Sequence, residues 1–352
     1  MKAIINVGLV GYGFASQTFH APLIRATEGL DLVAVSSSDA AKVQASLPHV
    51  DVEAQALALC KRSDIDLIVI PTPNDTHFPL AKAALSAGKH VVVDKPFTVT
   101  LSEGKLLKKL ADEKECLLSV FHNRRWDSDF LTIKALLDAG TLGRVVNVES
   151  RFDRFRPEVR DRWREKATPG GGIWYDLGPH LLDQACELFG MPQAILLELD
   201  ALRDGAKADD DFLALLDYEG FRVTLSAGTL VADPTPRFRI HGTQGSFVKY
   251  GLDPQEARLK AGEVPTPQWG EDNQHGILTL REGEGENAPL VRRELPTLPG
   301  DYLAYYQGIA AAIRDKAPLP VTVDDALRSM VLLEAGLDSH RQRRWISLKN
   351  HL

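Results

Sequence analysis

Lys95, Asp176 and His180 are the side chains of this sequence best suited to acid–base chemistry on an alcohol or a ketone. Lys95 follows the apolar run Val91–Val93 in "VVVDKPF", so a lysine stands at the end of a predicted buried strand. An ammonium group can stabilise an oxygen that gains negative charge. An imidazole, with an ordinary pKa of about 6.5, can accept a proton near neutral pH. The three residue types therefore fit the removal or return of a hydroxyl proton.

Asp176 and His180 lie four residues apart in "PGGGIWYDLGPHLLDQACELFG". Proline is tolerated in the first turn of a helix, so Pro179 predicts a helix that begins near Gly178, with Asp176 in the preceding turn. Both side chains can then face one cleft, where the carboxylate raises the basicity of the imidazole or anchors a substrate hydroxyl. Two structural interpretations stay open: a helix cap for Asp176 and a buried core histidine for His180.

A glycine turn in "VGLVGYGFAS" predicts a dinucleotide site. Gly11 permits a tight turn after the first strand, and Gly13 lets a diphosphate approach the backbone. The helix that follows, beginning with Phe14 and Ala15, offers N–H donors and a favourable dipole. Ser16 stands where a third small residue is usual, and it adds a hydroxyl to a helix–strand contact. A glycine turn without a ligand is the alternative.

The end of the second predicted strand bears on the choice between NAD and NADP. A carboxylate there would accept a hydrogen bond from the ribose 2′-hydroxyl of NAD. The sequence instead has three serines, of which Ser37 and Ser38 can donate to a 2′-phosphate, and Lys42 adds a positive charge. Asp39 is expected to cap the next helix. NADP is therefore the predicted cofactor, although serines also tolerate NAD.

Further residues are expected along the cofactor cleft because they follow the next two strands, at the edge of the sheet where ligands bind. They are Pro71, Thr72, Asn74, His77, Asp94 and Lys95. For His77 the alternative is a first-turn helical residue in solvent. The Lys95–Pro96 bond is a candidate for the cis form.

The first third of the chain alternates strands and helices, which predicts a parallel sheet covered on both faces. The predicted strands are Ile4–Val10, Leu32–Ser38, Asp66–Ile70, His90–Asp94 and Cys116–Val120, with Val50–Ala54 as a weaker candidate. The predicted helices are Phe14–Thr27 and Thr76–Ala87, the second with Gly88 as its C-cap.

After Phe121 the pattern changes to a period of two, which is typical of half-covered antiparallel strands. Val146, Val148 and Phe152 alternate with polar residues, as do Phe221–Ala227. Two helices, 302–314 and 324–340, precede a short strand near Trp345, and 281–287 is predicted as a hairpin loop. The fold class is thus α/β plus α+β: a Rossmann domain over residues 1–121, then a domain with a large, mostly antiparallel open sheet over 122–352.

Composition excludes several classes of protein. Of the 352 residues, 44% are hydrophobic and 25% charged, as expected of a globular protein, and the formal net charge of −7 argues against a nucleic-acid partner. No apolar run is long enough to cross a membrane. A strand pattern begins almost at residue 1, so no signal peptide is expected. The three dispersed cysteines indicate a reducing, cytoplasmic location and no metal site.

Arginines on either side of the predicted domain junction have two interpretations. Arg124 either contacts substrate or ties the domains together. The run Arg151–Lys166 is interleaved with acids and predicts a salt-bridged face, from which one or two arginines could reach a hydroxylated substrate. Asp183 is expected to bond a neighbouring arginine, and His20 to be structural.

These motifs together resemble the Gfo/Idh/MocA oxidoreductases. The resemblance covers essentially the whole chain: "GLVGYG", "DKP", "GGGIWYDLGPHLLD", "RFRIHGTQGSF" and the closing segment from Tyr305 to Ser339. It implies a catalytic trio of Lys95, Asp176 and His180, with Asp94 in place of the family's usual glutamate. "SVFHNRRWDSDF" and "FDRFRPEVRDRWRE" are similar to the NADP-dependent scyllo-inositol dehydrogenase subgroup, and only this similarity suggests a cyclitol.

The predicted function is NADP(H)-dependent interconversion of a secondary alcohol and a ketone on a polyol, cyclitol or sugar. His180 is the expected base, and Lys95 is the alternative. A nonenzymatic cofactor-binding sensor, or a dehydrogenase of a different carbonyl substrate, stays open. The half-covered sheet predicts a homodimer or higher homo-oligomer.

Overall fold

The computed structural model describes residues 4–266, 269–283 and 285–349. The chain forms two compact units. The N-terminal unit comprises Met1–Asn123, Gln255–Trp269 and Asp301–Met330, and the C-terminal unit comprises Arg124–Pro254, Gly270–Gly300 and Val331–Leu352. The division at Asn123 lies two residues from the predicted boundary. Two later segments, Gln255–Trp269 and Asp301–Met330, nevertheless belong to the first unit. The continuous range 122–352 is therefore not one compact unit.

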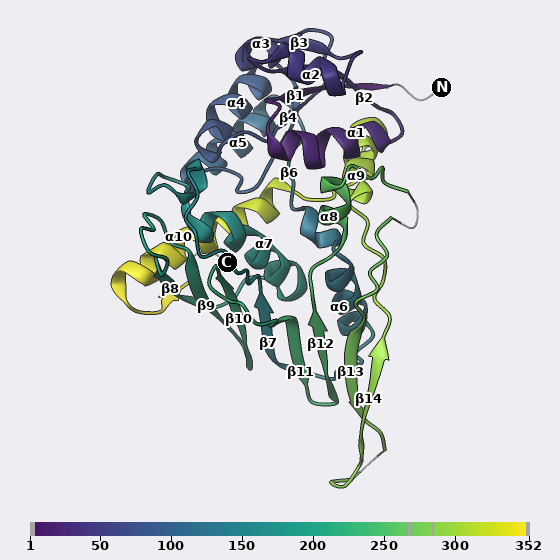
Figure 1. The fold of residues 1–352 in the computed structure, drawn as a ribbon, viewed down its shortest axis with the longest axis vertical. Helices are drawn as coiled ribbons and strands as arrows, with labels where there is room; N and C mark the ends of the chain where they lie inside the picture. Colours follow the sequence, from purple (N-terminus) through teal and green to yellow (C-terminus); the bar gives the residue numbers. More distant parts are fainter. Residues whose placement is uncertain (1–3, 267–268, 284, 350–352) are drawn as a thin grey trace. The chain divides into compact units, whose positions relative to one another are not determined.

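The N-terminal unit contains a six-stranded parallel sheet of strand order β3-β2-β1-β4-β5-β6 (Figure 1). Its strands are β1 Ile5–Val10, β2 Leu30–Ser36, β3 Asp51–Glu53, β4 Leu67–Ile70, β5 His90–Val93 and β6 Leu118–Val120. All four residues of β4 are buried, as expected of a strand covered on both faces. This arrangement confirms the predicted Rossmann fold.

Helices connect these strands, as the alternating pattern predicts. They are a π-helical turn Ser16–His20, then α1 Ala21–Ala26, α2 Ala40–Ser46, α3 Ala56–Leu59, α4 Asn74–Ser86 and α5 Leu101–Glu113. The later segments add α8 Gln255–Lys260 and α9 Leu303–Asp315, and α10 Val323–Gln342 runs from one unit into the other. Helix α4 begins two residues before the predicted Thr76, because Pro73 rather than the Asn-Asp-Thr run is its N-cap. Gly88 follows it with a positive φ of 74°, as predicted.

The C-terminal unit contains a nine-stranded sheet of order β14-β13-β12-β11-β7-β10-β9-β8-β15. The strands are β7 Val145–Arg151, β8 Ala194–Asp200, β9 Asp211–Tyr218, β10 Phe221–Gly228, β11 Pro236–Gly242, β12 Gly245–Tyr250, β13 Gly276–Arg281, β14 Leu290–Leu295 and β15 Ile346–Ser347. Adjacent strands are antiparallel except β7 and β10, which pair in parallel. The predicted mostly antiparallel sheet is therefore confirmed.

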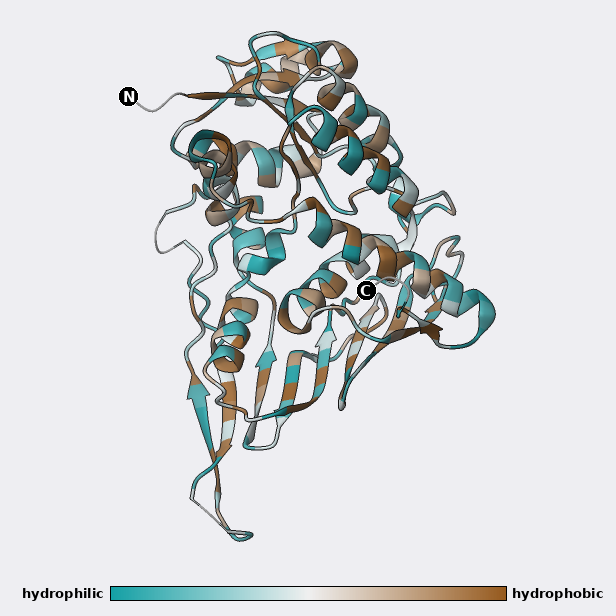
Figure 2. Cartoon of the chain, turned by 180° about the vertical axis from the view of Figure 1, so that it is seen from behind, coloured by the Kyte–Doolittle hydropathy of each residue, from teal (hydrophilic) through white to brown (hydrophobic). Residues whose placement is uncertain are grey.

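One face of this sheet forms the core of the C-terminal unit. Phe212, Ala214, Leu216 and Tyr218 alternate along β9 with more exposed residues, and Val223 and Leu225 do so along β10. Figure 2 shows the resulting brown and teal bands across the strands. Helix α7 Gly172–Phe189 packs on β9 and β10, and α6 Ser128–Asp138 is joined to α7 by an ion pair of 2.6 Å between Lys134 and Glu187.

The remaining sequence predictions concern loops and spans. The predicted hairpin loop 281–287 joins β13 to β14, which pair antiparallel, although residue 284 lies outside the described residues. Among the described residues, no helix combines the length and the apolar character needed to span a bilayer.

Candidate functional site

The glycine turn lies between β1 and the first helix, as predicted. Gly11 has a φ of 80°, a conformation that glycine adopts without strain. A Cβ atom added at Gly13 would meet no other atom within 4 Å, so the backbone there faces open space. The buried Ser16 hydroxyl donates a hydrogen bond of 2.8 Å to the Gly11 carbonyl. The serine at the third position of the motif therefore holds the turn closed, and the turn keeps room for a diphosphate.

The end of β2 supports this turn and leaves two serines beyond the strand. Ser36, the last residue of β2, accepts a hydrogen bond of 3.0 Å from the Gly11 amide. Ser37 is half-buried and bonds the backbone of Asp39, while Ser38 and Lys42 are exposed. The Asp39 carboxylate accepts the Lys42 amide at 3.0 Å, which confirms the predicted helix cap. The only acid within three residues of this strand end is thus engaged in capping α2.

His77 joins the loops that follow β4 and β5. One ring nitrogen lies 2.9 Å from the Thr72 carbonyl oxygen and the other 2.9 Å from that of Pro96. The side chain is fully buried, so the alternative of a solvent-exposed first-turn residue is wrong. Burial lowers the pKa of His77 below its ordinary value, against the opposing effect of Asp94 and the backbone carbonyls. The neutral imidazole favoured by burial has one N–H, so it donates to one of the two carbonyls and lies between the loop after β4 and the loop carrying Lys95.

Asp94, directly before Lys95, is held from within the N-terminal unit. Its carboxylate accepts the Lys95 amide at 2.7 Å and lies 3.8 Å from Nε2 of His20. Burial alone would raise the pKa of Asp94, but the neighbouring His20, together with Lys95 and His77, lowers it to about 2. His20 is buried and its Nδ1 lies 2.5 Å from the Tyr306 hydroxyl on α9, which fits the predicted structural role. The Lys95–Pro96 bond is cis, as predicted.

Three loops of the N-terminal unit meet at one edge of the sheet. β1, β4 and β5 are neighbours and parallel, so their carboxyl ends lie together. A Cβ on Gly11 would lie 3.4 Å from the Thr72 side chain, and His77 connects Thr72 to Pro96. Pro71 and Asn74 flank Thr72 in this loop, and Asn74 is buried as the first residue of α4. Lys95 thus follows a strand that ends at the same edge of the sheet as the glycine turn, with the loop after β4 between them.

Helix α7 carries both Asp176 and His180 within the C-terminal unit. The helix begins at Gly172, so the prediction that it begins near Gly178, with Asp176 in a preceding turn, is wrong. Pro179 lies inside the helix rather than at its first turn. Because residues four apart share a helix face, Asp176 and His180 still project in similar directions. His180 is buried, and the Asp176 carboxylate is 27% exposed and 3.4 Å from Nε of Arg164.

The first turn of α7 is capped by a residue distant in sequence. The Asp209 carboxylate accepts the Trp174 amide at 2.8 Å, and its backbone carbonyl accepts the Ile173 amide at 2.8 Å. The Trp174 ring then packs edge-on against Phe212, 5.0 Å between ring centroids. These contacts position the helix turn that carries Asp176.

Arg124 and Asp183 both form buried ion pairs, of which only that of Asp183 was predicted. Arg124 lies 3.2 Å from the Asp127 carboxylate and stacks on the Phe152 ring at 4.7 Å, all inside the C-terminal unit. Asp183 accepts two hydrogen bonds from Arg125, of 2.8 and 2.7 Å, which confirms its predicted structural role. Arg124 as a substrate-binding residue stays a prediction.

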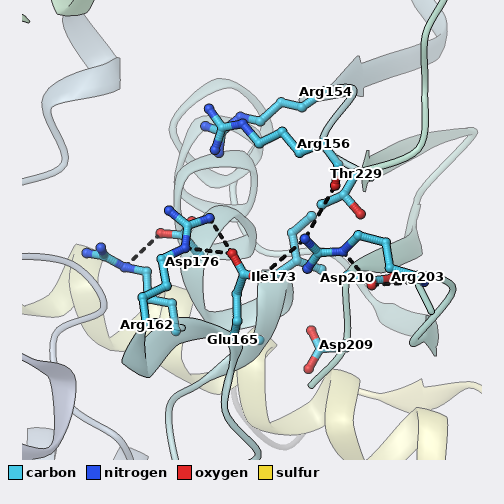
Figure 3. Close-up of a pocket in the computed structure, with 12 residues that line it drawn as sticks. Arg154, Arg156, Arg162, Glu165, Ile173, Asp176, Arg203, Asp209, Asp210 and Thr229 are labelled. Atoms are coloured by element: carbon cyan, nitrogen blue, oxygen red, sulfur yellow. Dashed lines mark hydrogen bonds and ion pairs between the residues drawn. The ribbon is translucent and has the colours of Figure 1, made fainter. Parts of the chain in front are cut away.

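A pocket of the C-terminal unit contains Asp176 and is rich in arginine (Figure 3). It encloses about 410 Å³, part of it open to solvent. Its charged lining residues are Arg154, Arg156, Arg162, Arg164, Arg203, Glu165, Asp176, Asp209 and Asp210. The predicted salt-bridged face is present in part, since Glu165 pairs with Arg162 at 2.6 Å and with Arg203 at 3.2 Å.

The predicted site residues thus fall into two groups. The predicted cofactor residues lie in the N-terminal unit, and Arg124, Asp176 and His180 lie in the C-terminal unit. The convergence of Lys95 with His180 stays a prediction. Sequence reasoning did not find Arg203, Asp209 or Asp210, which reach the Asp176 pocket from the loop between β8 and β9. The one signal was the acidic run Asp209–Asp211, whose partners lie far away in sequence.

The parallel sheet, its strand order and the glycine turn define a dinucleotide-binding α/β protein. Comparison with protein families makes the assignment specific. Residues 5–122 match the profile of the oxidoreductase family, NAD-binding Rossmann fold, and residues 134–348 match that of the oxidoreductase family, C-terminal alpha/beta domain. The chain belongs to the Gfo/Idh/MocA family of oxidoreductases.

Individual relatives extend over the full length of the chain. The uncharacterized oxidoreductase YdgJ of Escherichia coli is 55% identical over 99% of this chain and 100% of its own. The scyllo-inositol 2-dehydrogenase (NADP(+)) IolW of Bacillus subtilis is 39% identical over 98% of this chain and 96% of its own. The solved structure of the YPO2259 protein from Yersinia pestis is 56% identical, with a TM-score of 0.93 over 99% of this chain and 98% of that one.

The residues present fit a dinucleotide cofactor. The open space at Gly13 and the left-handed backbone at Gly11 form the cradle that a diphosphate needs. Gly11, Gly13, Phe14 and Ala15 would hold this part of the cofactor, with N–H groups at the start of the helix as donors. Among the described residues, no group of three or more histidine, cysteine, aspartate or glutamate side chains is arranged to hold a metal ion.

Proposed function

We propose that this protein is an NADP(H)-dependent dehydrogenase that interconverts a secondary alcohol and a ketone on a polyol, cyclitol or sugar. The observation that carries the proposal is the position of Lys95. It follows β5 at the edge of the sheet where the glycine turn lies, and His77 fixes its loop to Thr72. A lysine in this position can act on an oxygen next to the reactive end of a bound dinucleotide.

Each member of the trio then has a chemical role. When bound, the nicotinamide cofactor accepts the hydride that leaves the carbinol carbon. The hydroxyl proton must leave as well, and His180 is the proposed base for it. Lys95 donates a hydrogen bond to the same oxygen, an effect worth about 3 kcal/mol by analogy with an oxyanion-hole donor. Asp176 orients His180 or holds a neighbouring substrate hydroxyl.

The preference for NADP is supported by the end of β2 and by one relative. Ser37 and Ser38 follow the strand where NAD-specific folds place an acid, and Asp39 is engaged in capping α2. Exposed Lys42 lies in the first turn of that helix. IolW, which is 39% identical, uses NADP(+) by its name, and its substrate supports a cyclitol among the candidates.

A substrate screen tests the proposal directly. Inositol isomers, hexoses and linear polyols are incubated with NADP+ or NAD+, and the reduced cofactor is followed by its absorbance. We expect turnover of at least one polyol or cyclitol, with the higher kcat/KM for NADP+. If the protein binds NADPH but neither oxidises any alcohol nor reduces any ketone, a cofactor-binding sensor is favoured instead.

We further propose a cytoplasmic homodimer or higher homo-oligomer. None of the three cysteines forms a disulfide bond in the described part of the chain, as suits a reducing compartment. Leu213 on β9 is 42% exposed on the face of the nine-stranded sheet opposite the core, and Leu196 and Leu215 beside it are only half-buried. Apolar residues on such a face are suited to a subunit contact. Sedimentation velocity measures the subunit number; a monomer at micromolar concentration would contradict this assembly.

A further inference from the structure

The pocket around Asp176 contains more arginine than its acids neutralise. Arg203 pairs with Asp210 at 2.8 Å and with Glu165 at 3.2 Å, and Arg162 also pairs with Glu165. Arg164 lies 3.4 Å from Asp176. The carboxylate of Asp209 is engaged at the start of α7, and burial raises its pKa. Each acid of this pocket therefore has at least one of these partners, and the lining contains five arginines for four acids.

Arg154 and Arg156 are placed on one face by the backbone. The chain beyond β7 stays extended beside the end of β10: the Arg154 amide donates to the Gly228 carbonyl at 2.9 Å, and the Arg156 amide donates to the Thr229 carbonyl at 2.7 Å. Alternate residues of an extended segment share a face. Phe155, between the two arginines, is 59% exposed. Figure 3 shows the Arg154 and Arg156 side chains reaching in the same direction in this pocket.

Two polar side-chain groups of the pocket have no partner among the residues that the structure describes. In the described part of the chain, no carboxylate lies within ion-pair distance of the half-buried Arg156. The buried Thr229 hydroxyl has no hydrogen-bond partner among the same residues. A buried hydroxyl and a partly buried guanidinium are costly to leave unsatisfied. A negative ligand beside the Arg156 guanidinium would supply the missing counter-charge.

We propose that Arg154, Arg156 and Thr229 bind an oxyanion, carboxylate or phosphate, carried by the substrate. Guanidinium forks match both groups with paired charge-assisted hydrogen bonds. Asp176 in the same pocket accepts hydrogen bonds from hydroxyls, so the ligand combines hydroxyl groups with one acid group. This inference rests on the proposed function, because it makes a polyhydroxy acid the substrate class of the site that contains Asp176.

Direct binding tests the proposal independently of turnover. Isothermal titration at low salt compares neutral probes with acidic ones: myo-inositol, quinate and myo-inositol 1-phosphate, then glucose, glucuronate and glucose 6-phosphate. We expect an acidic probe to bind about tenfold or more tightly than its neutral counterpart, as for one charge-assisted contact. The preference should shrink at 0.5 M salt. Carboxylate and phosphate probes together show which oxyanion fits.

Matched variants assign the preference to the pocket. Arg156→Gln removes the guanidinium and should abolish the preference for acids. Arg25→Gln removes the same charge from an exposed position in the N-terminal unit and should leave the preference unchanged. Equal or tighter binding of neutral probes by the unmodified enzyme, or an acid preference that survives Arg156→Gln, would overturn the anion site.

The substrate screen keeps this inference separate from the proposed function. Turnover of a neutral cyclitol with no binding of any acid leaves the dehydrogenase intact and overturns the anion site. Acid binding that depends on Arg156, without turnover of any acid or neutral probe, supports the anion site and counts against the dehydrogenase.

Discussion

The imidazole of His77 lies 2.9 Å from the carbonyl oxygen of Pro96, the residue next to Lys95. Its other ring nitrogen lies 2.9 Å from the Thr72 carbonyl oxygen, so one buried side chain joins the loops after β4 and β5. His77→Leu removes the one N–H that the neutral imidazole donates to these carbonyls and should lower the free energy of unfolding by about 1–3 kcal/mol. Urea denaturation at pH 8 measures this loss.

The same histidine should make stability depend on pH. Burial keeps the pKa of His77 below 6.5 in the folded protein, so the unfolded chain binds the proton first. The contribution is fully present above pH 6.5 and is lost as the pH falls below it. The free energy of unfolding should therefore drop less between pH 7 and pH 5 in His77→Gln than in the unmodified protein. His49→Gln, at an exposed position, is the control, and identical pH profiles for all three proteins would contradict this assignment.

Gly11 and Gly13 should respond differently to alanine. Gly11→Ala places a side chain at a φ of 80° and should cost about 1–3 kcal/mol of folding free energy. Gly13→Ala places a methyl group in open space, so the fold should tolerate it while the cradle for the diphosphate is filled. Thermal unfolding and NADPH fluorescence titration separate the two effects. Unchanged NADPH affinity in Gly13→Ala would show that the diphosphate does not bind at this turn.

Ser37→Asp should move the cofactor preference from NADP toward NAD. The new carboxylate would follow β2 where it repels a 2′-phosphate and accepts from a 2′-hydroxyl. We expect the ratio of kcat/KM for NADP+ over NAD+ to fall about tenfold or more, which corresponds to roughly 1.4 kcal/mol. Ser46→Asp, at the exposed end of α2, adds the same charge as a control. A ratio unaffected by Ser37→Asp, or below one in the unmodified enzyme, would refute the role given to this strand end.

Local chemistry accounts for what the sequence alone could predict. The glycine turn, the Asp39 cap, the strands of the parallel sheet and the alternating segments around Val148 and Val223 depend on residues a few positions apart, and they agree with the structure. Helix α7 shows a feature that nearby residues alone do not predict. The start near Gly178 was inferred from Pro179, whereas the first turn is secured by Asp209, 35 positions beyond Trp174. Only tertiary folding brings that carboxylate to the helix.

The Asp176 pocket also depends on contacts between residues that are far apart in the sequence. Its arginines at 154–164 are visible as a basic run, yet Arg203, which also pairs with Glu165, and Asp210, which pairs with Arg203, come from a different loop. The Arg162–Glu165 pair agrees with the salt-bridged face that the interleaved charges of the run predict. These charges cannot show that Arg156 is left without such a partner among the described residues, because that follows from where the distant acids are committed.

Lys95→Ala and His180→Ala test the catalytic trio itself. Lys95→Ala removes the hydrogen-bond donor to the reacting oxygen, and His180→Ala removes the proposed base. Each should lower kcat by about a hundredfold or more, the usual range for a lost oxyanion donor or a lost general base. NADPH binding should persist, because the glycine turn is untouched. Steady-state kinetics and fluorescence titration measure the two properties.

A pH profile then separates the alternatives for the base. If His180 takes the proton, kcat/KM for alcohol oxidation should rise with pH as the imidazole loses its proton, and His180→Ala should remove that rise. If Lys95 is the base, the rise should persist in His180→Ala and disappear in Lys95→Ala. Lys105→Ala, at an exposed position on α5, removes an equal charge and should keep full activity. Full turnover in either catalytic variant would exclude that residue from the chemistry, since a group that moves the proton cannot be deleted without slowing the step.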